Sequence, residues 1–402
     1  MTESHLDARR EEIRAWCRAT VPADWRTTQT GASEAEYVAF QRWWAEELRQ
    51  AGYLAPHWPA EWGGGMSVQE QAVLFQELAA ADAPRARLGF VSLHHAAATL
   101  LVAGTPEQQQ RHLPAILEGE IWCQGFSEPE AGSDLASLKT RAERDGEHYV
   151  VTGQKLWATG AAEADWCLLL ARTDPSASKQ QGISFLLVDM TSDGIDIRPI
   201  RNANGESEFC EIFFDAVRVP VANRVGAEND GWAVAQRTLG AERGMTMLEL
   251  AERLSNAFRW LVDDCRTTYL QGDAVDGTVA HLSAVADRLV VLEIELEALR
   301  RMSRGLVARI ESETSGPVDP AILKLYYSEL LQRLNDFAVE IIGSPAQGMD
   351  RKPLSSGWES GAWVLDFIGS WEWTIPGGAS EIMRSIIGER GLGLPREPKA
   401  SR

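Results

Sequence analysis

The chain has 402 residues, 45% of them hydrophobic and 24% charged, which is the composition of a globular protein with two or three domains. Its formal net charge of −19 argues against a nucleic-acid surface, because phosphate binding depends on clustered Lys and Arg and the sequence has no basic block. No apolar run approaches the ~20 residues that cross a bilayer, and residues 1–7 lack the basic and apolar stretches of a signal peptide. We therefore expect a cytoplasmic protein that binds neither nucleic acid nor a membrane.

Helical patterns dominate residues 1–119. Helix formers recur at apolar spacing over Tyr37–Gln50 and Val68–Ala81, and Gly- and Pro-rich segments separate the helical patterns. Thr105 followed by Pro106 has the pattern of an N-cap and a first helical position, and predicts the start of another helix. The sequence thus predicts an all-helical N-terminal domain over residues 1–119.

Between residues 120 and 226 the pattern changes to short β-rich runs bounded by turn residues. These runs are His148–Thr159, Trp166–Arg172, Gly182–Met190, Ile195–Ile200 and Phe209–Pro220. They predict a small, β-barrel-like middle domain over residues 120–226.

Long helical patterns return after Gly231 and predict a four-helix bundle over residues 227–402. The predicted helices are Trp232–Leu270, Val279–Ile310, Asp319–Ile342 and a shorter one near Ser380–Glu389. The expected fold class is therefore α+β with three domains, in the order helical domain, β domain and helical bundle.

The placement of cysteine and histidine predicts no metal site. The five cysteines are widely scattered, with no close pair of the kind found in zinc sites or redox dithiols, so we expect buried free thiols. His94 and His95 are adjacent, so on a helix their side chains would point about 100° apart and would not hold one metal ion as an i, i+4 pair does.

Two short runs carry the most specific chemistry. Phe126–Asp134 (FSEPEAGSD) and Lys155–Gly160 (KLWATG) place polar, turn-forming and aromatic residues at two nearby strand ends. A flavin ring binds through a flat apolar contact and a few directed hydrogen bonds, which Trp157 with nearby hydroxyls can supply. Two other interpretations remain: Trp157 as a core aromatic, and the polar side chains as loop caps, which we favour for Glu128 and Asp134.

The two runs resemble those of the acyl-CoA dehydrogenase family, and the order of domains is similar to that family from about Trp43 to Arg396. Three further segments carry the resemblance, namely Trp58–Gly64, Gly226–Trp232 and Gly377–Arg384. The resemblance implies an FAD-dependent enzyme that oxidises an acyl-CoA thioester to its 2,3-enoyl form. It also implies that the electrons pass to an electron-transfer flavoprotein.

The resemblance implies residue roles at the two runs. Family residues that match Phe126 and Ser127 lie along the flavin, and the match of Ser133 lies along the pantetheine of the thioester. Those that match Trp157 and Thr159 pack on the flavin ring and bond its N5 side. We therefore expect Phe126 and Ser127 to bind the cofactor together with Trp157 and Thr159. We expect Ser133 to bind the substrate.

A catalytic base is required, because a carboxylate in a dry site must remove the α-proton of the thioester. Many family members carry this Glu in the tail motif, where Gly377 stands in this chain. Long-chain, branched-chain and steroid-side-chain types instead carry a Glu before an Arg on the first long helix of the third domain, and these match Glu242 and Arg243. The resemblance therefore implies Glu242 as the base and Arg243 as a substrate-binding residue.

The surroundings of Glu242 allow two interpretations. Helical spacing places it on one stripe with Leu239, Met245 and Thr246, and burial on such a largely apolar face would raise the pKa of its carboxyl. The other interpretation is a solvated helix face, because further acidic residues follow. Gly377 is expected to contact the substrate, through its backbone N–H or by leaving room for a bulky or branched acyl group.

The chain departs from the family at positions that reach the flavin of a neighbouring subunit. Arg266 occupies the region of the usual Arg, and Glu340 stands for the usual Gln ahead of the turn at Gly343. We keep these three residues as cofactor-binding candidates, although a carboxylate near a pyrophosphate is unfavourable unless it binds an amide or a hydroxyl. Steroid-degrading relatives with such departures often form heteromeric assemblies, so a homodimer, a homotetramer and a heterotetramer all remain open.

Two other functions also remain open. A flavin monooxygenase or oxidase of the same fold would not need a thioester base, so Glu242 favours the dehydrogenase. A non-catalytic subunit of a heteromeric acyl-CoA dehydrogenase is favoured by the altered residues Arg266 and Glu340 and disfavoured by the intact segment Trp157–Thr159.

Overall fold

The computed structural model describes most of the chain, which forms two compact units. The described residues are 3–241, 245–267, 279–316, 318–343, 348 and 351–396. Unit 1 comprises Met1–Ala39, Gly65–Arg85 and Arg243–Arg402, and unit 2 comprises Phe40–Gly64 and Ala86–Glu242.

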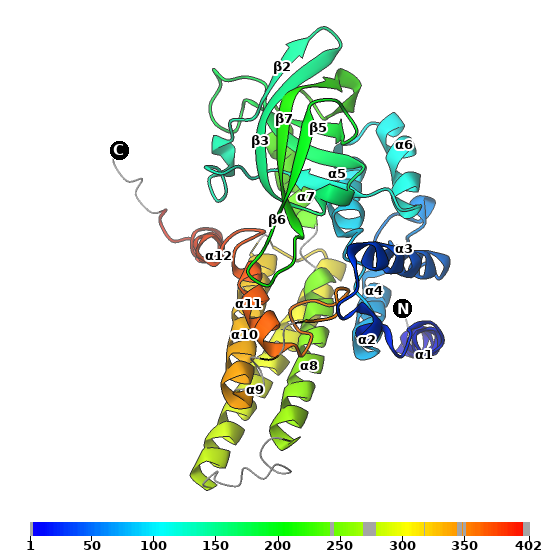
Figure 1. Cartoon of the computed structure of the whole chain (residues 1–402), viewed down its shortest axis with the longest axis vertical. Helices are drawn as coiled ribbons and strands as arrows, with labels where there is room; N and C mark the ends of the chain where they lie inside the picture. The colour runs from blue at the N-terminus through cyan, green and yellow to red at the C-terminus, as the bar shows by residue number, and fades with distance from the viewer. Residues whose placement is uncertain are drawn as a thin grey trace. The chain divides into compact units, whose positions relative to one another are not determined.

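Unit 2 contains an eight-stranded sheet (Figure 1). Its strands are β1 (Trp122–Gly125), β2 (Arg141–Asp145), β3 (His148–Thr159), β4 (Trp166–Arg172), β5 (Ile183–Asp189), β6 (Ile195–Ile200), β7 (Phe209–Pro220) and β8 (Arg224–Val225). The strand order is β6-β7-β3-β2-β4-β5-β8, and β1 pairs with β4 in parallel. The five predicted β runs are confirmed as β3 to β7, and only the bounds of β5 differ, by one residue at each end.

Burial explains why these runs form strands. The residues of β4 and β5 are buried at nearly every position, over Trp166–Ala171 and Ile183–Val188, as expected for strands that are covered on both faces. The first half of β3 instead alternates, and Tyr149 and Val151 point into a buried cluster that also contains Ile212 of β7. The predicted β domain in the middle of the chain is therefore confirmed.

Unit 2 also contains helices, and one of them, α6 (Pro106–Leu117), begins where the sequence predicts. The helices of unit 2 are α5 (Ala97–Ala103), α6, α7 (Gly231–Ala241) and most of α3 (Glu34–Gln50). At the start of α6 the Thr105 hydroxyl accepts the N–H of Gln108, and the Gln108 side chain accepts the N–H of Thr105 at 3.1 Å. This capping box, with Pro106 at the first helical position, confirms the predicted helix start.

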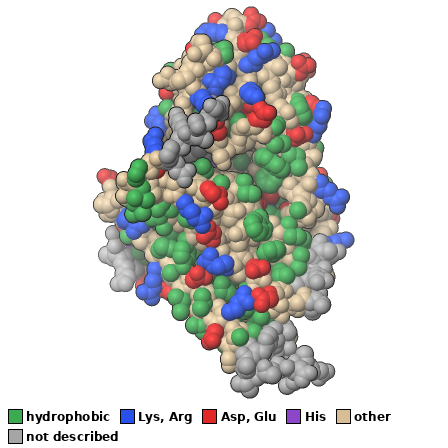
Figure 2. Space-filling model, turned by 90° about the vertical axis from the view of Figure 1, so that its left-hand side faces the viewer, with side chains coloured by type: hydrophobic (Ala, Val, Ile, Leu, Met, Phe, Trp, Pro, Cys, Tyr) green, Lys and Arg blue, Asp and Glu red, His purple; other side chains and the backbone are tan. Residues whose placement is uncertain are grey.

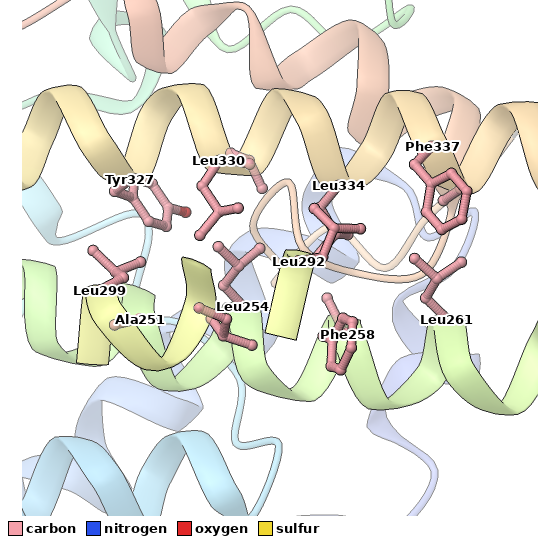
Figure 3. Packing of buried hydrophobic residues seen from close by; sticks show 14 of the residues in the cluster. Ala251, Leu254, Phe258, Leu261, Leu292, Leu299, Tyr327, Leu330, Leu334 and Phe337 are labelled. Atoms are coloured by element: carbon pink, nitrogen blue, oxygen red, sulfur yellow. The ribbon is translucent and has the colours of Figure 1, made fainter. Parts of the chain in front are cut away.

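Unit 1 is helical. Its helices are α1 (Glu3–Thr20), α2 (Trp25–Gln29), α4 (Val68–Ala80), α8 (Met245–Arg266), α9 (Val279–Glu311), α10 (Asp319–Ile342), α11 (Trp363–Ser370) and α12 (Ser380–Ile386). The long helices α8, α9 and α10 run side by side (Figure 1) and share a buried core to which each contributes Leu or aromatic side chains (Figure 3). In that core Leu254 and Phe258 of α8 face Leu330 and Leu334 of α10. The predicted C-terminal helical domain is therefore confirmed.

All five cysteines are buried free thiols, as predicted. Burial raises the pKa of Cys17 and of Cys265 to about 11 in each case, so neither thiol is activated as a nucleophile. Within the part of the chain that the structure describes, no helix has both the length and the apolar composition needed to cross a bilayer.

Candidate functional site

A β-bulge near the end of β3 determines the position of Trp157. Lys155 pairs with Ile212 of β7, and Ala158 pairs with Cys210, so β3 carries two residues between these pairs where β7 carries one. Trp157 is one of the two residues in the bulge and has a backbone φ of +62°, in a region that residues with bulky side chains rarely adopt. The bulge directs its ring outward, where it is 55% exposed.

The exposure of Trp157 contradicts its interpretation as a core aromatic. Four other tryptophans are almost completely buried, namely Trp44, Trp58, Trp122 and Trp363, whereas the Trp157 ring meets Phe209 edge to face at 6.0 Å and is otherwise largely open. A strained backbone that presents a large aromatic ring to the surface is a feature of ligand-binding sites rather than of cores.

The Phe126–Asp134 run lies directly beside this bulge. It follows β1, and the carbonyl of Ser127 accepts the N–H of Leu156 at 2.9 Å. Ser127 and Thr159 are half-buried, so both residues are partly accessible to a ligand. The structure therefore brings the two runs together, as expected for a shared site.

The remaining candidates of this run differ in accessibility. The Phe126 ring is only 6% exposed and packs edge to face on Phe185 at 5.7 Å, so little of it is open to a ligand. Ser133 is exposed, as substrate contact requires. Asp134 makes no side-chain cap, contrary to the interpretation we favoured, and its carboxylate binds the ammonium of Lys179 at 2.6 Å.

These features fit a flat aromatic cofactor. An exposed indole offers the stacking surface, and the half-buried residues Ser127 and Thr159 carry hydroxyls that can form directed hydrogen bonds. A flavin ring needs this combination of an apolar face and a few polar contacts, and all of these residues belong to unit 2.

The sequence did not reveal how Lys155 and Glu128 interact. The Lys155 side chain is fully buried, and its Nζ donates to Glu128 Oε1 at 2.8 Å. Glu128 also accepts the backbone N–H of Lys139 and Thr140, so it does bind free amides, but those of a segment 11 and 12 residues further along. The strand alternation was an available signal, because Lys155 has the same parity as the inward-facing Tyr149 and Val151.

In unit 1 the tail motif forms a turn with open space beside it. Gly377 has a φ of +64°, and among the described residues no heavy atom lies within 4 Å of the place where a Cβ would be. The turn is held at the next residue, where the Gly378 carbonyl accepts the ammonium of the buried Lys324 at 2.7 Å. The predicted base Glu242 and its neighbour Arg243 lie outside the described residues.

The three candidates for the neighbouring flavin lie on the long helices of unit 1 or directly after them. Arg266 is exposed and pairs with Asp263 at 3.1 Å on the same helix. The Glu340 carboxylate pairs at 2.6 Å with Arg288, whose guanidinium lies over the Phe337 ring. This pairing offsets the negative charge that would oppose a pyrophosphate. Gly343 ends α10 with a φ of +65°.

Unit 1 also contains a buried carboxyl that the sequence did not reveal. Asp366 on α11 accepts the N–H groups of Ser360 and Gly361 at 2.7 and 2.8 Å, and burial raises the pKa of its carboxyl to about 7. Because these bonds close the loop that precedes α11, we assign Asp366 to the fold rather than to the reaction.

Three family models match successive parts of the chain. They describe the N-terminal domain of acyl-CoA dehydrogenase over residues 3–120, the middle domain over residues 123–217 and the C-terminal domain over residues 229–392. The acyl-CoA dehydrogenase IpdE1 of Mycobacterium tuberculosis is 36% identical to this chain, over 97% of this chain and 98% of its own length.

Two solved structures resemble the chain in both fold and sequence. The steroid ACAD Tcur3481-Tcur3483 is 30% identical with a TM-score of 0.83, and the match covers 99% of both chains. The ChsE4-ChsE5 complex from Mycobacterium tuberculosis is 29% identical with a TM-score of 0.79, and the match again covers 99% of both chains. The chain therefore belongs to the acyl-CoA dehydrogenase family of flavin-dependent oxidoreductases.

Proposed function

We propose that this chain binds FAD and converts an acyl-CoA with a bulky or branched acyl group to its 2,3-enoyl-CoA, passing the electrons to an electron-transfer flavoprotein. The observation that carries the proposal is the exposed, backbone-strained Trp157 beside Ser127 and Thr159, in a chain of this family. The chemistry that FAD supplies when bound is acceptance of the hydride from the β-carbon of the substrate.

The residues of unit 2 would hold the cofactor and part of the substrate. Trp157 would stack on the ring, Thr159 and Ser127 would bond its polar border, and Phe126 would support the same segment from the core. The exposed Ser133 would bond the pantetheine. Because the bulge already holds the Trp157 backbone in the conformation that exposes the ring, binding would need no backbone rearrangement at this residue.

A bulky acyl group is supported by Gly377 and by the relatives. Among the described residues, the position where a side chain is missing at Gly377 stands next to open space, and other members of the family carry a Glu there. The structure Tcur3481-Tcur3483 is titled a steroid ACAD, which is consistent with a large substrate for this chain. Glu242 would then be the base that removes the α-proton, and Arg243 would contact the substrate.

Anaerobic titration with a panel of acyl-CoAs tests the proposed function. We expect steroid-like and branched acyl-CoAs to bleach the visible absorption of the bound flavin, because hydride transfer reduces it. A protein that takes up FAD but is bleached by none of these thioesters would contradict the dehydrogenase. Rapid reoxidation by air without an electron-transfer flavoprotein would instead favour an oxidase.

Replacing Trp157 by Ala is expected to weaken FAD binding. Loss of aromatic stacking should cost about 0.5–1.5 kcal/mol beyond the lost buried area, and this stacking term alone raises the dissociation constant about two- to twelvefold. Fluorescence titration with FAD measures this dissociation constant. Trp43→Ala removes another exposed tryptophan and serves as the control. Equal FAD affinity in wild type and Trp157→Ala would show that Trp157 does not contact the cofactor.

Helix α9 has exposed apolar side chains on one turn of its outer face, which suits assembly. Leu292, Leu296 and Leu299 point into the core of unit 1, yet Val290 and Ile294 are 52% and 64% exposed. A helix that is apolar on both sides is normally buried on both sides. Figure 2 shows one face of the molecule, on which apolar side chains lie between charged ones.

We therefore expect the chain to form a dimer or a tetramer that covers this face. Ile294→Asp should shift the assembly to smaller species in light scattering, because it would place a charge in an apolar contact. Ala284→Asp introduces the same charge at another exposed position of the helix and serves as the control. A wild-type chain that is monomeric, carries full FAD and is active would contradict this expectation.

A heteromeric assembly is the second candidate. The ChsE4-ChsE5 structure is titled a complex of two named components, and the altered residues Arg266 and Glu340 are paired within unit 1. In that case the chain alone would hold less than one FAD per subunit and would gain FAD with its partner. One FAD per chain in the isolated protein would remove this candidate.

A further inference from the structure

A buried ion pair joins the two runs that flank the candidate flavin surface. The Lys155 side chain is 0% exposed and the Glu128 side chain 8% exposed. Besides its bond to Glu128, the Lys155 ammonium donates to the carbonyl of Phe126 at 3.0 Å. The stem of Lys155 passes close to Gly125, where an added Cβ would lie 3.4 Å from Lys155 Cγ. One lysine thus ties β3 to the end of β1 and to the first residues of the following run.

The Glu128 carboxylate extends this connection to a third segment. Its Oε2 accepts the N–H of Lys139 at 2.6 Å, and its Oε1 accepts the N–H of Thr140 at 2.9 Å. The backbone of Glu128 also pairs with Ala131 in both directions, which closes the turn of the run. Every one of these bonds converges on the single carboxylate or its backbone, so the turn, β3 and the segment ahead of β2 are held together.

The bulge at Trp157 follows directly after this connection. Strained backbone persists only where the surrounding structure over-determines it. On one side the bulge is held by Lys155 and by the bond from the Leu156 N–H to Ser127. On the other side Thr159 pairs with Phe209, and the N–H of Gly160 binds the carbonyl of Glu208 at 2.9 Å. The backbone that carries the exposed indole is therefore fixed from both ends.

We propose that Lys155 and Glu128 are positioning residues that hold Trp157 and the Phe126–Ser127 backbone in the arrangement that binds the flavin. The proposal rests on the proposed function, because it assigns the pair a role at the same cofactor site. The Lys155 side chain is fully buried and the Glu128 side chain almost so, and both act through the residues they bind.

A charged pair suits this positioning role better than an apolar pair for a physical reason. An apolar pair would fill the same space, but it would not select one register, whereas a buried ammonium must find its specific acceptors. Burial pushes the pKa of Glu128 upward, but the charge and the hydrogen bond of Lys155 outweigh this effect, so the pKa of the carboxyl lies below its usual value. The carboxylate therefore stays ionised and keeps its partner.

Three variants of the full chain test the proposal: Lys155→Met, Glu128→Gln and the double variant. Hydrogen exchange at Leu156 is measured without flavin, and FAD affinity is measured by fluorescence titration. We expect the exchange rate of the Leu156 N–H to rise at least about tenfold in both single variants. Removing one partner leaves the other buried without its pair, so the segment that the pair holds should open more often. The dissociation constant of FAD should rise by a similar factor.

The double variant separates positioning from stability. With both charges removed, no charge is left buried and unpaired, so its thermal unfolding midpoint should return towards that of the wild type. Its FAD affinity should stay low, because the Phe126 carbonyl still lacks its donor. A double variant that binds FAD as tightly as the wild type would overturn the proposal, even if a single variant does not fold.

Val151→Ala is the matched control, because it creates a cavity in the same strand away from the bulge. It should lower the unfolding midpoint without changing exchange at Leu156 or FAD affinity. If it weakened FAD binding as much as Lys155→Met, the effect would be general stability and the positioning role would be wrong. If the wild type bound no FAD, the proposed function would be wrong. Unchanged hydrogen exchange at Leu156 in the single variants would overturn the positioning role of Lys155 and Glu128, whatever the result for FAD.

Discussion

Glu242→Gln is expected to leave FAD binding intact and to slow substrate-driven flavin reduction by roughly 10²–10⁴-fold, the range found when a general base is lost. Gln has nearly the same volume as Glu and keeps a polar carbonyl, but it does not accept the α-proton. Hydride cannot leave the β-carbon unless the α-proton is removed, so the loss should appear in the reduction rate and much less in substrate affinity.

Anaerobic stopped-flow measurement of flavin absorption gives this rate directly. Glu34→Gln, a change at an exposed position at the start of α3, controls for the loss of one negative charge and should reduce flavin at the wild-type rate. Flavin reduction by Glu242→Gln within a few-fold of wild type would eliminate Glu242 as the base. Loss of FAD from the variant would show instead that Glu242 supports the cofactor site.

The strands could be predicted from the sequence because their signals are local. The β runs of the middle domain alternate or are wholly apolar and end at turn residues, so β3, β4, β6 and β7 have the predicted bounds. The start of α6 follows equally from Thr105 and Pro106. β1, β2 and β8 were missed because they are short or, like β2, mostly charged.

The geometry of the candidate site could be predicted only in part. The composition of Lys155–Gly160 indicated a ligand site, but the bulge depends on the register between β3 and β7, and local sequence does not specify a register. The same holds for the pair of Lys155 and Glu128, which lie 27 residues apart and meet only through the sheet. It also holds for Arg288 and Glu340, which are 52 residues apart on different helices.

These unpredicted contacts change the meaning of the predicted residues. Glu340 appeared as a charge in the wrong place for a pyrophosphate, whereas the structure pairs its carboxylate with Arg288. Glu128 was interpreted as a loop cap, and it does accept two backbone N–H groups, but it is also the acceptor of a fully buried lysine. Residue types indicate the kind of chemistry, and partners that are remote in sequence decide which charges are available for it.

Replacing Gly377 by Gln is expected to lower kcat/KM for bulky acyl-CoAs on the order of 10–200-fold relative to small straight-chain acyl-CoAs. One methylene more or less in a hydrophobic pocket changes the ratio of kcat/KM values between two substrates by about this factor. A Gln side chain is larger than a methylene, so it should change the ratio between bulky and small acyl-CoAs at least as strongly if it fills space that the acyl group needs. Gln is preferred to Glu because it adds volume without adding a second carboxylate. The open space beside Gly377 allows the side chain to be placed without a clash among the described residues.

The backbone at Gly377 makes a matched control necessary. Its φ of +64° lies in the left-handed region, where a residue with a Cβ is strained by about 1–3 kcal/mol. Gly393 has a φ of +67°, and no heavy atom of the described residues lies within 4 Å of the place where its Cβ would be, so Gly393→Gln carries a similar strain outside the proposed site. Because strain lowers stability for all substrates alike, only a change in the ratio between bulky and small acyl-CoAs reports on substrate room. Equal losses for both classes in Gly377→Gln would show that the glycine is needed for its turn and does not accommodate the acyl group.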